Sequence, residues 1–251
     1  MAALDTYIAQ INQFQNLMYL KYQTHKTLNC LQVTNGINSL LFFNEGRKVG
    51  SKIVLKKDVF LELGGPDAGS CEITLYTNIP AQIEDGRITI IGPDVNEAKT
   101  KAVPFAQIIM VGGEKLTEED YYCLLQNLNI SELIEGFMIR STTENIWCRV
   151  SREAAKNGFN FQVLGSVLNW KIRKILPEVQ SVEIIFVTTA KEDVAKLNQI
   201  GAGVREIARS IKERIWLEKG IDIYKCLPGG HCGACKDKAI CDNIRRIGKA
   251  Q

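Results

Sequence analysis

Four cysteines near the end of the chain are the residues whose type and spacing could do chemistry. They follow the pattern Cys-x5-Cys-x2-Cys-x5-Cys within a short segment: Cys226, Cys232, Cys235 and Cys241. A Cys-x2-Cys pair turns two thiolates inward from one loop, and the short flanking arms can bring the other two to the same centre. The pattern therefore predicts that these four residues bind a single metal centre.

The identity of the metal follows from ligand type and spacing. Four thiolates suit either zinc or an iron–sulfur cluster, but structural zinc sites usually have two separate Cys-x2-Cys pairs and this segment has one. Gly229, Gly230 and Gly233 would let backbone N–H groups approach anionic sulfur. The segment favours a [4Fe–4S] cluster, with zinc as the alternative and disulfides as a third interpretation. His231 is expected to support the ligands rather than replace one.

The composition is that of an ordinary globular protein. The chain has 251 residues, 45% of them hydrophobic, which is enough for one large or two small domains with real cores. A net charge of +3 does not argue for nucleic acid. No apolar run approaches the roughly 20 residues that span a bilayer, and the N-terminus lacks the pattern of a secretory signal. We therefore expect a cytoplasmic protein with reduced thiols, and neither nucleic acid nor a membrane as partner.

Other residues of chemical interest give weaker signals. Four further cysteines are scattered singly among apolar neighbours and are expected to be small buried residues: Cys30, Cys71, Cys123 and Cys148. With only His25 and His231 in the sequence, a Ser-His-Asp or Cys-His catalytic centre is not expected. The tryptophans Trp147, Trp170 and Trp216 are expected in the core.

The first 50 residues predict a helix followed by a hairpin. Leu4, Ile8 and Ile11 begin an apolar stripe at helical spacing that continues to about Tyr22. Apolar runs at 30–33 and 40–43 flank an Asn-Gly pair, which is typical of a β-hairpin. A polar connector at 44–52 then separates this region from the next. We predict three parts: residues 1–49, an α/β domain at 50–225 and a cysteine-rich segment at 226–251.

Short strands alternate with helices in the central part. Strands are predicted at 59–63, 71–76, 87–91, 106–111, 146–150 and 182–188, the last of them buried on both faces. Thr117 is expected to cap a helix that ends near Asn127, since three acids follow it, and Ser151 to cap a helix that ends at Gly158. Further helices are predicted at 163–176 and 204–218. The fold class is α/β (mixed α+β) with a metal-binding C-terminal segment.

Several strings of this sequence resemble one known family. Residues 56–66 (KKDVFLELGGP) and 82–94 (QIEDGRITIIGPD) resemble the β subunit of the CO dehydrogenase/acetyl-CoA synthase complex. Residues 134–138 (IEGFM), 146–154 (IWCRVSREA) and 182–189 resemble it too, in the same order and at similar spacing. The resemblance covers the part from about residue 50 to about residue 225 and is too specific to be chance.

The resemblance implies an acetyl-CoA-synthase-like domain, a [4Fe–4S] cluster and one-carbon metabolism. In that family the domain leads into a cubane bridged to two nickel ions, which joins a methyl group from a corrinoid iron–sulfur protein to CO and coenzyme A. The family's cubane cysteines are spaced Cys-x2-Cys-x8-Cys-x9-Cys, and a later Cys-Gly-Cys holds the distal nickel. This sequence contains no Cys-x-Cys, and a cubane would use all four clustered thiolates, so nickel is not expected.

Three functional hypotheses follow. The favoured one is an electron-transfer or accessory iron–sulfur protein that works with a corrinoid iron–sulfur or corrinoid methyl-carrier protein. The second is a CO-methylating acetyl-CoA synthase component, an acyltransferase whose nickel site is completed elsewhere. The third is a non-catalytic scaffold stabilised by zinc. The sequence does not name a catalytic residue for any of them.

Overall fold

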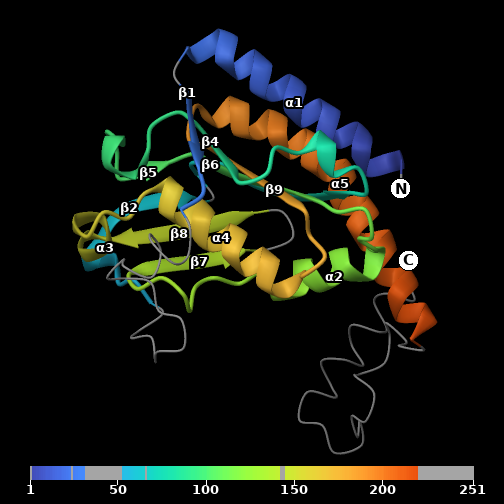
Figure 1. Ribbon diagram of the computed structural model, residues 1–251. Coiled ribbons are helices and arrows are strands. Elements are labelled where there is room, and N and C mark those ends of the chain that lie inside the picture. Colours follow the sequence, from blue (N-terminus) through green and yellow to red (C-terminus); the bar gives the residue numbers. More distant parts are fainter. Residues whose placement is uncertain (1, 24, 32–52, 66, 142–144, 220–251) are drawn as a thin grey trace, which may run out of the picture. The chain divides into compact units, whose positions relative to one another are not determined.

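The computed structural model describes residues 2–23, 25–31, 53–65, 67–141 and 145–219 (Figure 1). The chain divides into two compact units, Met1–Ile207 and Ala208–Gln251. The first unit contains all of the described strands and every described helix that ends before residue 190. In the described part of the chain, none of the helices combines the length and the hydropathy that crossing a bilayer would require.

The larger sheet has five strands in the order β1-β4-β9-β6-β3. These are β1 (His25–Asn29), β4 (Arg87–Ile91), β9 (Ser181–Val187), β6 (Phe105–Gly112) and β3 (Ser70–Thr77). The pairs β4–β9 and β3–β6 are parallel, whereas β1–β4 and β6–β9 are antiparallel. Every residue of β6 and β9 is buried, which confirms the predicted strand that is covered on both faces.

The smaller sheet has four strands in the order β5-β2-β8-β7. These are β5 (Ala102–Val103), β2 (Val59–Gly64), β8 (Ile146–Ser151) and β7 (Phe137–Ser141). In β8, Ile146, Cys148 and Val150 are fully buried, whereas Trp147 and Arg149 between them are partly exposed. This alternation is typical of a sheet with one face on the core.

Helices cover the two faces of the larger sheet (Figure 1). On one face lie α1 (Ala2–Tyr22), which packs against β3, and the first part of α5 (Lys191–Glu218), where Gly201 approaches Ile73. On the other face lies α4 (Phe161–Ile175), where Gly165 approaches Ile88 of β4. The smaller sheet is on this second face too, because Ser141 of β7 donates a hydrogen bond to Glu72 of β3.

The predicted helix caps are present. Thr117 and Asp120 form a reciprocal capping box at the start of α2 (Glu118–Asn127), so the acids there are helix-start residues. Ser151 Oγ accepts a hydrogen bond of 3.0 Å from the Ala154 amide at the start of α3 (Arg152–Lys156). These contacts confirm both predicted helix starts.

Several boundaries and environments differ from the predictions. Helix α5 begins at Lys191, well before the predicted residue 204. The strands β1, β5 and β7 were not predicted. Most of the predicted hairpin lies outside the described residues, and so do both predicted domain boundaries, which stay predictions.

The tryptophans are less buried than expected, although Trp147 does pack against a cluster of buried residues that includes Val54 and Met138. Trp147, Trp170 and Trp216 are each partly exposed. Each ring has a cation over it, and the distances from that cation to the ring centroid are 4.5 Å, 4.8 Å and 4.4 Å respectively. An indole ring can thus cover the sheet or helix surface while its other face binds a basic side chain.

Candidate functional site

The predicted metal ligands lie outside the described residues, as do His231 and the three glycines between them: Cys226, Cys232, Cys235 and Cys241. The chemistry of the donor set can still be compared with the cluster. Four thiolates in one short segment match the four irons of a cubane, one ligand for each iron. The metal centre therefore stays a prediction that fits the residues present.

The other four cysteines are spread over separate elements. Cys71 and Cys148 are buried, as expected, and burial raises the pKa of Cys71 to about 12 and the pKa of Cys148 well above its usual value. Cys30 is only half-buried, and its pKa is raised to about 11 by burial. Cys123 is exposed on α2, so the prediction of burial was wrong there.

The thiols of Cys30, Cys71 and Cys148 are unsuited to metal binding. A thiol with a raised pKa stays protonated at neutral pH and is a poor ligand and nucleophile. Among the residues that the structure describes, no three His, Cys, Asp or Glu side chains gather closely enough to hold a metal ion.

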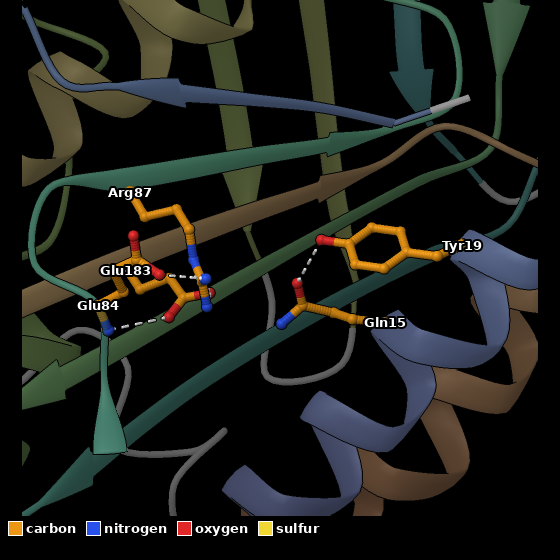
Figure 2. Close-up of polar contacts among 5 residues, drawn as sticks. All are labelled: Gln15, Tyr19, Glu84, Arg87 and Glu183. Carbon is orange, nitrogen blue, oxygen red and sulfur yellow. Dashed lines mark hydrogen bonds and ion pairs between the residues drawn. The ribbon is translucent and has the colours of Figure 1, made fainter. Parts of the chain in front are cut away.

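A buried ion pair joins the starts of β4 and β9 (Figure 2). Glu183 is only 1% exposed, and Arg87 donates to its Oε1 from Nε and Nη2 at 3.0 Å and 2.8 Å. The Glu84 amide donates to Oε2 at 3.3 Å. Burial raises the pKa of Glu183, although Arg87 opposes that shift. All of these partners belong to the protein, so the pair fixes two strands in place.

Two other acids of the string 82–94 connect the ends of β4 to neighbouring elements. Asp85 Oδ1 accepts from the Val182 amide at 3.0 Å and from the Arg173 guanidinium of α4. Asp94 Oδ1 accepts from the amides of Val95 and Phe161 at 2.7 Å and 3.0 Å. The string therefore positions β9 and α4 around β4.

The end of α1 is held at the start of α5. Asp193 is fully buried, and its oxygens accept from Lys21 Nζ at 2.8 Å and from the Tyr22 hydroxyl at 2.5 Å. Burial alone would raise the pKa of Asp193, but these hydrogen bonds hold it below its usual value. The contact fixes the end of α1 against the start of α5.

A cavity of about 630 Å³ opens beside this contact. Its lining comes from the end of α1, the start of β1, the segment after β4 and the segment after β9: Tyr22, His25, Lys26, Gly92, Pro93, Glu97, Thr189 and Ala190. The His25 ring lies on Tyr19 with 3.8 Å between the ring centroids, and Lys26 forms an exposed ion pair with Glu97. The cavity thus combines apolar walls with one basic side chain, one acidic side chain and an imidazole.

Residues 43–194, which are more than half of the chain, match the family described as CO dehydrogenase/acetyl-CoA synthase complex beta subunit. The chain belongs to this family. It is 29% identical over 189 residues to the acetyl-CoA decarbonylase/synthase complex subunit beta of Methanothermobacter thermautotrophicus. The aligned region covers 73% of this chain and 38% of the relative. It is 31% identical over 147 residues to subunit beta 1 of the same kind of complex from Methanosarcina mazei. That alignment covers 57% of this chain and 30% of the relative.

The chain matches well under half the length of these relatives, and the Archaeoglobus fulgidus subunit beta gives the same result. That protein is 28% identical over 178 residues, covering 69% of this chain and 33% of the relative. The family match ends at residue 194, before the four clustered cysteines. Family membership therefore accounts for the α/β scaffold of this chain.

Within the family domain, the strings that carry the resemblance have structural roles. Arg87 and Glu84 hold Glu183, while Asp85 and Asp94 hold neighbouring elements. Sequence reasoning did not find the cavity, although two of the pairs that line it, Gly92-Pro93 and Thr189-Ala190, directly follow strands that were predicted. The cavity could not be predicted because the local sequence does not show that β4 pairs in parallel with β9, and this pairing brings the two segments together.

Proposed function

We propose that this chain is an iron–sulfur protein that acts in or alongside corrinoid-dependent methyl transfer, in one-carbon and acetyl-CoA metabolism. Its role there is electron transfer or that of an accessory subunit. The observation that carries the proposal is a scaffold of the CO dehydrogenase/acetyl-CoA synthase β family joined to the four cysteines of the pattern Cys-x5-Cys-x2-Cys-x5-Cys. Cys226, Cys232, Cys235 and Cys241 would hold a [4Fe–4S] cluster, which supplies one-electron chemistry when bound.

The described residues support an assignment of the chemistry to the cysteine segment. The acids most deeply buried in the scaffold, Glu183 and Asp193, bind side chains of the protein itself. The thiols of Cys71 and Cys148 are buried and protonated at neutral pH. These groups stabilise the domain, whereas the four clustered cysteines have the residue type and number that a redox cluster requires.

The family also suggests the kind of partner and compartment. The relatives are named as subunits of an acetyl-CoA decarbonylase/synthase complex, and we propose that this chain likewise works within a protein complex. A corrinoid iron–sulfur or corrinoid methyl-carrier protein is the partner that we propose, in the cytoplasm, where thiols stay reduced.

Metal and sulfide analysis of the full chain, purified without oxygen, tests the proposal. We expect about four irons and four sulfides per chain, since four thiolates ligate one cubane. Cys235→Ser should lower the iron content and the visible absorbance, while Cys123→Ser, which changes an exposed thiol on α2, should leave both unchanged. A colourless protein with one zinc would contradict the proposal and support the zinc scaffold instead.

A second function is favoured by family membership itself. If this chain is a component of a CO-methylating acetyl-CoA synthase, its nickel site must be completed elsewhere, because these 251 residues contain no Cys-x-Cys. The complex would then contain nickel and would exchange labelled CO into acetyl-CoA. Absence of both from a complex that contains the iron–sulfur cluster would leave the electron-transfer or accessory role.

A further inference from the structure

The larger sheet contains a point where two neighbouring parallel strands send the chain to opposite faces. Strands β4 and β9 pair in parallel, so their carboxyl ends lie at the same edge. After β4, Asp94 binds the Phe161 amide at the start of α4. After β9, the chain enters α5, which approaches Ile73 on the other face. In open α/β sheets, such a divergence leaves a crevice at the strand ends, and ligands commonly bind there.

The cavity described above lies at this divergence. Gly92 and Pro93 directly follow the end of β4, and Thr189 and Ala190 follow the end of β9. Its volume of about 630 Å³ is within the range of small-molecule sites, which is roughly 300–1,000 Å³. The topology and the cavity are separate observations, and both indicate a ligand site in the first compact unit.

The side chains at the crevice determine the class of ligand. The Lys26 ammonium and the His25 imidazole can both donate hydrogen bonds to an oxyanion. The nearby carboxylate of Asp193 is fully buried and bound to Lys21 and Tyr22, so Glu97 is the single acid of the lining. Without Glu97, the lining would carry a net positive charge.

Glu97 can release Lys26 and keep its other contact. One carboxylate oxygen binds Lys26, while the other accepts from the Asp94 amide at 3.0 Å. The ion pair is exposed, at 44% for Lys26 and 50% for Glu97, and exposed pairs are weak because water competes with them. An oxyanion held inside the crevice could therefore take the place of Glu97 at Lys26.

We propose that this crevice binds a small organic molecule with one carboxylate or phosphate group, through Lys26 and His25. The apolar remainder of the ligand packs against Tyr22, Pro93 and Ala190. The Tyr19 ring contacts the His25 ring at a tilt of 33° and holds it in place. When the crevice is empty, Glu97 forms the ion pair with Lys26. This inference goes beyond the proposed iron–sulfur function, because the crevice is formed by residues of the scaffold and not by the cysteine segment.

Chemical-shift titration of the isotope-labelled full chain tests the proposal. The probes are inorganic phosphate and acetate, each compared with sodium chloride at equal ionic strength. We expect saturating shifts of the Gly92 and Ala190 amides and of the His25 ring with at least one probe. Saturation by phosphate alone assigns a phosphate ligand, and saturation by acetate alone assigns a carboxylate. Linear shifts with both probes, equal to those with chloride, would overturn the proposal.

Matched variants separate binding from folding. Lys26→Gln should weaken the binding of the responding probe at least five-fold. Glu97→Gln should tighten it several-fold, because the amide keeps an oxygen for the Asp94 amide and removes the competing charge. A gain in affinity is not a result that a folding defect can produce. Lys99→Gln, which changes an exposed lysine outside the lining, should leave binding unchanged. Equal affinity in all three variants would overturn the proposal. The result does not depend on iron content, so it stands apart from the test of the proposed function.

Discussion

The buried acids Glu183 and Asp193 are each matched to a basic side chain of the protein, and this makes such pairs sensitive to single substitutions. Arg87→Met would leave the Glu183 carboxylate buried without its cation. Removal of one partner of a buried pair usually costs about 3 to 5 kcal/mol, and Arg87 is partly exposed, so we expect the lower end. Chemical denaturation of the variant and the parent protein measures the loss.

Arg173→Met is the matched control for that substitution. Arg173 pairs with Asp85, and both side chains are well exposed, at 36% and 53%. Exposed pairs contribute about 0 to 1 kcal/mol, and Asp85 keeps its bond to the Val182 amide. Equal destabilisation by the two substitutions would show that burial of Glu183 does not govern the effect.

Glu72 gives a prediction of pH dependence. Its oxygens accept hydrogen bonds from Gln107 Nε2, at 3.3 Å, and from the Ser141 hydroxyl, and burial raises its pKa above the usual value of 4.5. Because the folded pKa is raised, Glu72 contributes stability that is fully present below the unfolded pKa and is lost as the pH rises through the folded pKa. Glu72→Gln removes this titration. The stability of the variant relative to the parent should therefore increase from pH 4 toward pH 8.

The contribution of Asp193 to stability should depend on pH in the opposite direction to that of Glu72. Its folded pKa is lowered, so its contribution is present above the unfolded pKa and is lost as the pH falls through the folded pKa. Thermal unfolding at several pH values measures both effects. If the difference between Glu72→Gln and the parent protein does not change with pH, the carboxylate of Glu72 is not perturbed in the folded state.

At the scale of elements, close packing of α4 on β4 depends on a glycine. A Cβ atom at Gly165 would lie 2.7 Å from Ile88 Cδ1, and Ile88 is fully buried. Gly165→Ala should therefore destabilise the protein by about 1 to 3 kcal/mol, although alanine favours a helix. Denaturant unfolding measures this effect.

A double substitution identifies the cause. Ile88→Val removes Cδ1 and costs about 0.5 to 1.5 kcal/mol by itself. Because it also makes space for the new methyl group, the double variant should be more stable than the sum of the two single effects predicts, with a coupling of at least about 0.5 kcal/mol. Additive effects would locate the strain at another contact of α4.

The elements that the sequence predicted well are those with strong local signals. Strand β9 could be predicted from its apolar run, and the starts of α2 and α3 from the capping residues Thr117 and Ser151. Burial on both faces and helix capping each leave a signal within a few consecutive residues. Strand β1 was missed because its sequence, HKTLN, is polar and its place is an edge of the sheet. The first half of α5 was missed because Gly201 and Gly203 interrupt the helical pattern.

Those two glycines illustrate why tertiary contacts override local propensity. A Cβ atom at Gly203 would lie 2.0 Å from the Tyr7 hydroxyl of α1, and one at Gly201 would lie 3.2 Å from Ile73. The glycines lower helix propensity but permit close packing, and the packing partner is invisible in the local sequence. The same reason applies to the sites: cysteine spacing predicts a metal centre, whereas the crevice requires the strand order.

At the scale of the whole molecule, the described scaffold has the means to fold without the predicted cluster. In the first unit β6 and β9 are buried along their whole length, and the deeply buried acids Glu183 and Asp193 bind partners within that unit. Small metal-dependent domains fold only with their metal because they lack such a core. The fold of Met1–Ile207 should therefore not depend on the cluster.

Removal of the cluster tests that independence. Replacement of Cys226, Cys232, Cys235 and Cys241 by serine should abolish iron binding, while the main unfolding transition shifts by less than about 3 °C, because less than about 1 kcal/mol of scaffold stability depends on the cluster. Calorimetry under anaerobic conditions measures the transition, and amide hydrogen exchange in β6 and β9 shows which part of the chain unfolds in it. Cys71→Ser is the contrasting variant, because it places a hydroxyl in the buried core and should lower the transition temperature. If the fourfold variant loses protection in β6 and β9 instead, the metal centre is structural, and the zinc-stabilised scaffold becomes the better description of this protein.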